Sequence, residues 1–201
     1  MAATYKVLAD PYAHCRVSDV FPVDLAESVL AWFETEAPWA RLPGHHAGHG
    51  SFDLGSVKTP DEIAPVNSPL LFQSWRESLD GLLALPLGKL LEARAHHATP
   101  GEAVGIHNDN DQGTMRFIVH FNRGWSPDSG GYMTLIRSDN PLDLDRRIIP
   151  PRHNTGIVLP LGLHSYHAVG DMTRGDRYTI VYTFGDERWR RRCEPLPIPG
   201  G

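Results

Sequence analysis

The sequence has little cysteine and no long apolar segment. Its two cysteines, Cys15 and Cys193, are too few for a disulfide framework and lack the close spacing of metal-binding pairs. No apolar run approaches the roughly 18 residues that cross a bilayer, and the N-terminal residues lack the apolar stretch of a signal peptide. We therefore predict ordinary thiols, no membrane partner and a cytoplasmic protein.

An excess of positive charge is also missing. The net charge is -5 and the isoelectric point is near 6.1, whereas proteins that bind nucleic acid usually carry a basic stripe that neutralises phosphates. One dense basic run, Arg188 with residues 190–192, lies near the C-terminal end. We interpret it as a solvated tail rather than a phosphate site, and predict no nucleic-acid partner.

Size and composition are those of an ordinary globular protein. The chain has 201 residues, of which 41% are hydrophobic and 21% charged. This length suffices for one sizeable hydrophobic core but would be crowded for two complete domains. We predict a single domain over 1–201, with a helical N-terminal part to about residue 89, a β core over 90–186 and a tail over 187–201.

Two amphipathic helices are predicted in the first half. Over 24–36, the apolar residues recur at helical spacing and gather on one face. The second helix begins at Ser68 and Pro69, a capping residue followed by proline in the first turn, and continues to Leu83. Both helices should pack on a flat surface such as a sheet.

A glycine-rich segment over 44–51 separates these helices and is predicted to be a mobile loop. Its histidines, His45, His46 and His49, are more suited to substrate contact than to metal binding, because flexible glycine neighbours disfavour a preorganised site. Substrate specificity is expected to reside in loops such as 44–56.

From residue 90 onward, short apolar or alternating runs are separated by turn signals, the pattern of an antiparallel β domain. The predicted strands span 91–97, 104–109, 115–121, 132–136, 147–149, 156–159, 167–169 and 177–184. Short strands with a helical cover predict a mainly β (α+β) fold, a double-stranded β-helix or jelly roll with the N-terminal helices on one sheet.

His107 and Asp109 are the first candidate metal ligands. Residues i and i+2 of a strand share a face, so the imidazole and the carboxylate should project together into the barrel. With a second imidazole they would occupy one face of an octahedron, the facial triad of non-haem Fe(II) oxygenases. An H-x-D pattern alone is weak evidence, since it occurs roughly 0.8 times by chance in a chain of this composition.

The order of further residues strengthens this interpretation. His167 begins a predicted strand, and Arg177 opens another strand ten residues later. Arg177 could clamp a distal carboxylate in the same cavity, and Thr179, on the same strand face, could add a hydroxyl hydrogen bond. This suits 2-oxoglutarate, whose keto-acid end can chelate iron while its far carboxylate meets Arg177 and one metal position stays open for O2.

At these residues the chain resembles the 2-oxoglutarate oxygenases. His107 with Asp109, then His167, then Arg177 with Thr179 are similar to the HxD, distal His and Arg-x-Ser/Thr pattern of that superfamily. The segment 116–135, with its Gly130-Gly131 turn, resembles the prolyl-hydroxylase-type branch, and 10–21 resembles the N-terminal strand and helix start of these enzymes. The resemblance implies a jelly-roll enzyme with His107, Asp109 and His167 as iron ligands and catalytic centre.

Three positions qualify the resemblance. The branch often has an aromatic residue where His120 stands and a tyrosine near Ala98, so other residues complete the cosubstrate pocket here. Related halogenases have a small residue in place of Asp109. The resemblance therefore implies hydroxylation or another oxidation rather than halogenation.

Several residues have competing interpretations. His164 is the alternative to His167 as third ligand, and is interpreted as a loop or rim residue. Of His96 and His97, the one that faces inward is a candidate substrate residue, and His97 is our choice. Arg116 and Arg137 could bind a substrate carboxylate or lie on an exposed strand face; we select Arg116, together with Tyr132, as candidate substrate residues.

The sequence thus predicts a dioxygenase, dependent on Fe(II), 2-oxoglutarate and O2, that hydroxylates an amino acid, a peptidyl residue or a small metabolite. The alternatives are a cupin-like metal-binding isomerase and a non-catalytic binding protein. Arg177 argues against the isomerase, which has no need for a clamp on a cosubstrate carboxylate, and the intact triad argues against a non-catalytic binding protein.

Overall fold

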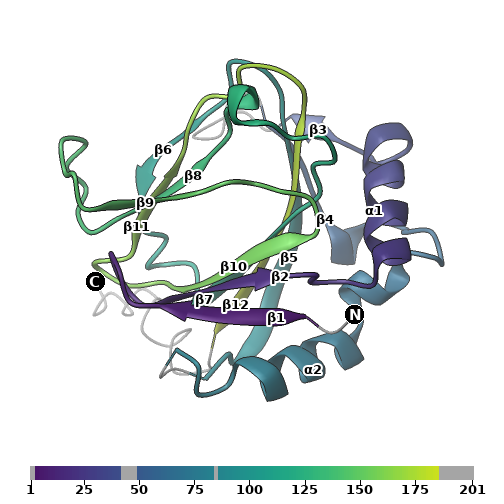
Figure 1. The fold of residues 1–201 in the computed structure, drawn as a ribbon. Helices are drawn as coiled ribbons and strands as arrows, with labels where there is room; N and C mark the ends of the chain where they lie inside the picture. The colour runs from purple at the N-terminus through teal and green to yellow at the C-terminus, as the bar shows by residue number, and fades with distance from the viewer. Residues whose placement is uncertain (1–2, 42–48, 84–85, 186–201) are drawn as a thin grey trace, which may run out of the picture.

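A computed structural model describes residues 3–41, 49–83 and 86–185. The chain folds into two antiparallel sheets that face each other, with both α-helices outside the larger sheet (Figure 1). The larger sheet contains, in spatial order, β1 (Thr4–Leu8), β2 (His14–Ser18), β10 (Thr155–Pro160), β7 (Met115–His120), β12 (Arg177–Gly185), β5 (Lys89–Ala98), β4 (Gly50–Asp53) and β3 (Ala40–Arg41). The smaller contains β6 (Val104–His107), β11 (Tyr166–Val169), β8 (Met133–Ile136) and β9 (Arg146–Ile149).

The helices are α1 (Val23–Thr35) and α2 (Pro69–Leu79), accompanied by the short 3-10 helices η1 (Leu54–Ser56), η2 (Ala64–Asn67) and η3 (Pro127–Ser129). Ser68 caps α2, its hydroxyl accepting a hydrogen bond from the Leu71 amide at 3.3 Å. None of the described helices is both long and apolar enough to span a membrane.

The main hydrophobic core lies between the helices and the outer face of the larger sheet. Trp75 of α2 packs edge-on against Tyr182 of β12, with ring centroids 4.8 Å apart, and Phe33 of α1 stacks on Tyr178 at 5.8 Å. The fully buried Tyr182 hydroxyl donates to the Val66 carbonyl at 2.8 Å. These contacts anchor the outer face of β12, whose inner face turns toward the second sheet.

A smaller apolar cluster fills one part of the space between the sheets. It joins Ile118, Ile157 and Leu159 of the larger sheet to Met133, Leu135 and Ile149 of the smaller one, with Leu161 beside them. Side chains alternate along β7 and β12, so each strand contributes to both clusters.

The predicted jelly-roll class is confirmed, as are both helices and all eight predicted strands, within a few residues at their ends. The second helix ends at Leu79 rather than Leu83, where Asp80 leaves the helical conformation and Gly81 takes a φ of +84°.

Four strands were not predicted as such: β1, β2, β3 and β4, although the resemblance implied a strand within 10–21. The predicted loop over 44–51 is wrong at its end, because Gly50 and Ser51 begin β4 and pair with His97 and His96 of β5. The segments 42–48 and 186–201, with His45, His46, the basic run and Cys193, lie outside the described residues.

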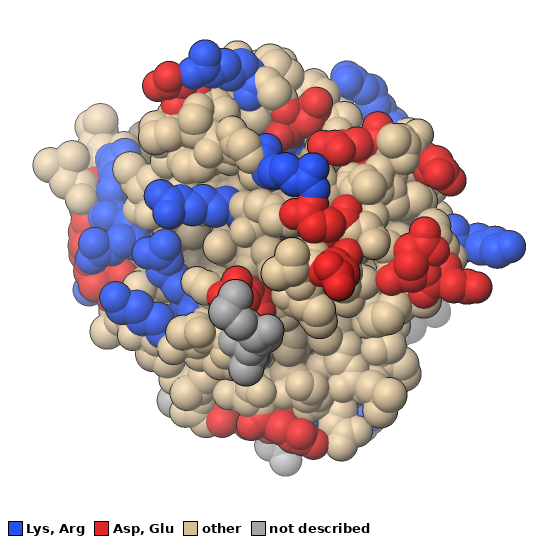
Figure 2. Space-filling view, turned by 45° about the vertical axis from the view of Figure 1, so that its right-hand side comes forward, with Lys and Arg blue, Asp and Glu red and all other residues tan. Residues whose placement is uncertain are grey.

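Figure 2 shows one face of the molecule, on which basic side chains gather at the left and acidic side chains at the right. Side chains of both signs also occur elsewhere on this face, so neither sign covers it.

Candidate active site

A cavity of about 340 Å³ lies between the two sheets. It is lined by residues from both, and its polar side chains fall into three groups. One gathers at His107, one at Arg177, and one along β5 and β7. The lining comprises His49, Ser51, Glu92, Arg94, His96, Val104, His107, Asp109, Gln112, Arg116, Ile118, Met133, His167, Val169, Arg177, Thr179 and Val181.

The first group contains two imidazoles from paired strands. β6 and β11 pair antiparallel with His107 directly opposite His167, and the ring centroids are 4.2 Å apart. Each ring places Nδ1 near the carbonyl two residues earlier, His107 at 2.8 Å from Gly105 and His167 at 3.1 Å from Ser165. A carbonyl can only accept, so Nδ1 carries the proton and Nε2 of the neutral ring presents a lone pair.

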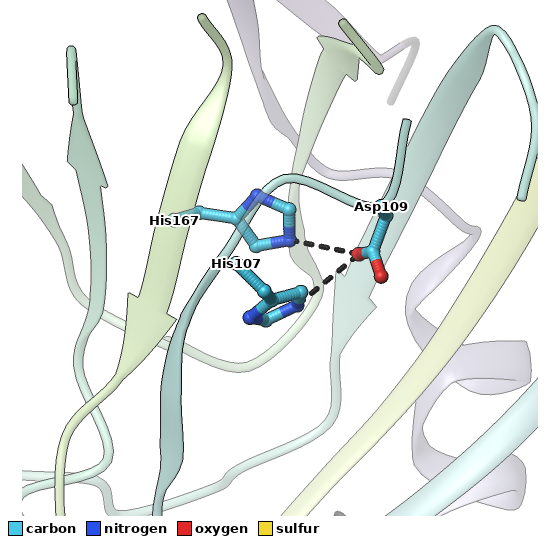
Figure 3. A group of neighbouring side chains, drawn as sticks. All are labelled: His107, Asp109 and His167. Carbon is cyan, nitrogen blue, oxygen red and sulfur yellow. Dashed lines mark hydrogen bonds and ion pairs between the residues drawn. The ribbon is translucent and has the colours of Figure 1, made fainter. Parts of the chain in front are cut away.

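Asp109 completes this group. Its Oδ2 lies 3.1 Å from Nε2 of His107 and 3.1 Å from Nε2 of His167 (Figure 3). All three ligand atoms lie within 4.8 Å of one another. Two ring lone pairs and a carboxylate oxygen that converge in this way repel one another unless a cation lies among them. The cluster therefore fits a divalent metal ion, or a proton in its place.

The pKa values describe the charge state of this cluster. Burial opposes a charge on His107, but the hydrogen bond and negative charge of Asp109 prevail and raise its pKa. Burial lowers the pKa of His167. Although burial would raise the pKa of Asp109, its contacts with both imidazoles and the charge of Arg116 lower it strongly. Asp109 thus remains a carboxylate, the state in which it can bind a metal.

The backbone reaches this geometry by a route other than the predicted one. β6 ends at His107, and Asp109 lies beyond it with a left-handed φ of +52°. The extension of the strand to Asp109 is therefore wrong. A turn instead directs the carboxylate back toward the imidazoles, held by the Gln112 amide group, which donates to Oδ1 at 2.8 Å. Nη1 of Arg116 donates to Oδ2 of Asp109.

The second group lies on the inner faces of β12 and β7. Arg177 is 6% exposed and forms no ion pair with a described carboxylate, and its Nε has no hydrogen-bond partner there. Thr179 Oγ1 and both ring nitrogens of His120 are also buried and also have no hydrogen-bond partner among the described residues. Burial lowers the pKa of Arg177 to about 10, and burial with the nearby Arg177 charge lowers that of His120 well below its usual value. Unpaired buried donors beside a buried cation suit an anionic ligand.

Glycine makes room for this arginine. Gly131 has a φ of +66°, and a Cβ there would lie 2.1 Å from Met172 Sδ and 3.1 Å from Arg177 Cδ. The close approach explains the second glycine of the Gly130-Gly131 turn, because any side chain would displace Met172 or the stem of Arg177.

Two predicted substrate residues lie outside the cavity. His97 is on the opposite face of β5, where its ring stacks on Tyr178 at 4.6 Å and its Nε2 lies 2.9 Å from Asp176. Tyr132 precedes β8; its hydroxyl donates to the Pro127 carbonyl at 3.2 Å and its ring packs on Trp125. Both predictions are wrong in placement, because the adjacent residues, His96 and Met133, face inward.

The remaining competing candidates, Arg116 against Arg137 and His164 against His167, lie in different environments. Arg116 lines the cavity, whereas Arg137 is exposed and pairs with Asp10 and Asp145. His164 is exposed in the turn before β11, while His167 is 3% exposed inside the cluster. Glu92, Arg94 and Gln112 also line the cavity and were not predicted as site residues. Alternation along β5 could have grouped the first two with His96.

No protein-family model matches the sequence, and neither does any curated protein. Solved structures do match. A prolyl hydroxylase from Trichoplax adhaerens, in complex with a hypoxia-inducible-factor peptide, is 16% identical over 90% of this chain and 87% of its own, with a TM-score of 0.71. A Pseudomonas putida prolyl-4-hydroxylase is 16% identical over 86% and 92%, with a TM-score of 0.65.

A third similar structure is SnoN, a non-haem, α-ketoglutarate-dependent epimerase from nogalamycin biosynthesis. It is 15% identical over 96% of this chain and 87% of its own, with a TM-score of 0.59. The chain has the fold of these proteins, as the resemblance to the prolyl-hydroxylase-type branch implied. Because one fold supports different reactions, the chemistry must be argued from the site.

Proposed function

We propose that this protein is an Fe(II)- and 2-oxoglutarate-dependent dioxygenase that hydroxylates an amino acid, a peptidyl residue or a small metabolite. The observation that carries the proposal is the convergence of His107 Nε2, His167 Nε2 and an Asp109 oxygen within 4.8 Å. A two-histidine, one-carboxylate set leaves positions open for other ligands and is the donor set of non-haem Fe(II) oxygenases.

His107, Asp109 and His167 would hold the iron and thereby form the catalytic centre. The carbonyls of Gly105 and Ser165 fix the tautomer and the direction of the two rings, and Gln112 orients the carboxylate. When bound, Fe(II) supplies the redox chemistry by which O2 oxidises the cosubstrate and the substrate.

Arg177 and Thr179 would bind the distal carboxylate of 2-oxoglutarate. The guanidinium is buried without a described counter-ion, and the Thr179 hydroxyl lacks a partner. A carboxylate that accepts hydrogen bonds from the guanidinium and the hydroxyl would supply the counter-ion and the missing partner. In the overall reaction, substrate C–H, O2 and 2-oxoglutarate would give C–OH, succinate and CO2. One atom of O2 would enter the hydroxyl group and the other would enter succinate.

Arg177 also separates this proposal from its alternatives. A cupin-like isomerase or a non-catalytic metal-binding protein does not require a buried arginine in the cavity that also contains His107, Asp109 and His167. The comparison with an epimerase leaves the oxidative outcome to experiment, and the carboxylate of Asp109 favours hydroxylation over halogenation.

Anaerobic titration provides the test. Adding Fe(II) and then 2-oxoglutarate to the protein should produce the visible charge-transfer band of the chelate. The variant Asp109→Ala should lose this band and substrate-stimulated succinate formation, because one of three metal ligands is gone. Asp111→Ala, an exposed neighbour, is the matched control and should keep both. Full turnover in Asp109→Ala, or no band in the unmodified protein, contradicts the proposal.

A further inference from the structure

The third polar group in the cavity has no role in holding iron or 2-oxoglutarate. Glu92, Arg94 and His96 project from β5 at alternate positions, and Arg116 projects from β7. β12 lies between these two strands, with Thr183 opposite both Glu92 and Arg116. The group therefore forms one wall of the cavity next to the metal cluster.

Arg94 is neutralised within this wall. Its Nε and Nη2 lie 2.9 and 2.5 Å, respectively, from Oε1 of Glu92. Both side chains are partly exposed and neighbour each other on the same strand face. The two charges cancel, so Arg94 and Glu92 together leave the cavity's net charge unchanged.

Arg116 differs from Arg94 in its contacts. Its side chain is 13% exposed, and its Nε donates to the Thr183 hydroxyl at 3.3 Å. Its Nη1 contacts Oδ2 of Asp109, the oxygen that both imidazoles face, and its Nη2 donates to Oε1 of Gln112. A metal ion held by this oxygen would share its negative charge, and Arg116 would then need another anionic partner.

The charges of the described cavity lining indicate how much negative charge is missing. Three arginines, Arg94, Arg116 and Arg177, face two carboxylates, Glu92 and Asp109, so one positive charge is in excess while the histidines are neutral. A divalent metal adds two positive charges and 2-oxoglutarate removes two. One positive charge is therefore left when both are bound, and Arg116 is the arginine whose described carboxylate partner, Asp109, is also a proposed metal ligand.

We propose that Arg116 binds a free carboxylate of a small substrate beside the metal centre. This inference rests on the proposed function and narrows its substrate to the acid of an amino acid or of a short peptide's C-terminus. Because the guanidinium reaches the metal-facing oxygen of Asp109, the carbon that is hydroxylated should lie within a few bonds of that carboxylate.

The experiment compares acids with their amides. The standard L-amino acids, their primary carboxamides, and dipeptides with a free or amidated C-terminus are titrated calorimetrically into protein loaded with Mn(II) and 2-oxoglutarate, which does not turn over. We expect the best acid to bind at least about tenfold more tightly than its amide, because a charge-assisted, two-point contact is lost in the amide. The amino-acid and dipeptide arms distinguish the two sources of the carboxylate.

Arg116→Met should remove the preference for the acid, and Arg116→Lys should restore part of it. Arg137→Met, which removes an exposed arginine outside the cavity, is the matched control and should retain the preference. Equal binding of acid and amide by the unmodified protein, including binding of neither, overturns the inference, as does an undiminished preference in Arg116→Met.

Failure of this inference is distinguishable from failure of the proposed function. The charge-transfer band of Fe(II) with 2-oxoglutarate needs no substrate. A normal band without discrimination between acid and amide contradicts only the role of Arg116, whereas an absent band contradicts the oxygenase assignment itself. Measuring the band in each variant also shows whether loss of the Arg116–Asp109 contact has disturbed the metal ligands.

Discussion

Arg177 is the residue on which the assignment to a 2-oxoglutarate enzyme depends most. Arg177→Met keeps the length of the side chain but removes the buried charge, and should weaken 2-oxoglutarate binding by about a hundredfold, since a buried charge-assisted pair is lost. Arg137→Met, which changes an exposed arginine outside the cavity, should have no effect. Both can be measured as the cosubstrate dependence of the charge-transfer band; unchanged binding in Arg177→Met would refute the clamp.

Residue-scale prediction from the sequence succeeded where the spacing carried geometric information. Arg177 and Thr179 do face the cavity together, as their spacing on one strand required. His97 was placed wrongly because alternation along β5 separates two faces without telling which one is inward. Asp109 reached its predicted neighbours through a left-handed turn, a conformation that the H-x-D spacing does not reveal.

At the scale of elements, the turn before β8 sets the position of β12's first residue. Gly131→Ala should lower the free energy of unfolding by about 1–3 kcal/mol, since the methyl group meets Met172 and the backbone is left-handed. It should also weaken cosubstrate binding, because Arg177 Cδ lies beside the new atom.

Gly124→Ala is the control for that variant. Gly124 has a similar φ of +72°, but a Cβ there would meet nothing within 4 Å, so it incurs only the backbone cost of about 1 kcal/mol. Urea unfolding and cosubstrate titration of both variants separate the two effects. Equal losses in both would show that crowding at Gly131 is unimportant.

Two of the four strands that were not predicted, β3 and β4, are too short to be recognised. β3 has two residues and β4 has four, and β4 follows a glycine-rich segment, so neither displays enough alternation to be recognised. β4 pairs with β5 and β3 pairs with β4, so the long strand β5 supplies the order that the two short strands' own sequences lack. The eight strands that were predicted are bounded by proline, glycine, asparagine or aspartate turns, which local sequence does encode.

At the scale of the whole molecule, buried histidine makes stability depend on pH. The pKa of His120 in the folded protein lies well below 6.5, first through burial and then through Arg177, whereas the unfolded chain takes up a proton near that value. The unfolded state thus binds more protons as the pH falls below about 6.5, and stability is lost there by up to about 1.4 kcal/mol per pH unit for this group.

His120→Phe should therefore reduce the loss of stability between pH 7 and pH 5, measured by urea unfolding at each pH. His164→Asn, at an exposed position, controls for removal of an imidazole elsewhere and should leave the slope as it is in the unmodified protein. Identical slopes for His120→Phe and the unmodified protein would show that His120 does not titrate in this way.

The central place of β12 has a consequence for biosynthesis. β12 is the last described strand in the chain, yet it lies between β7 and β5 in the middle of the larger sheet. Its inner face supplies Arg177 and Thr179, and its outer face supplies Tyr178 and Tyr182 to the main core. A chain emerging from the ribosome holds both neighbours of β12 before β12 itself exists. A nascent chain that lacks β12 has neither the outer face of β12 in its core nor Arg177, so it could not bind a ligand through that residue.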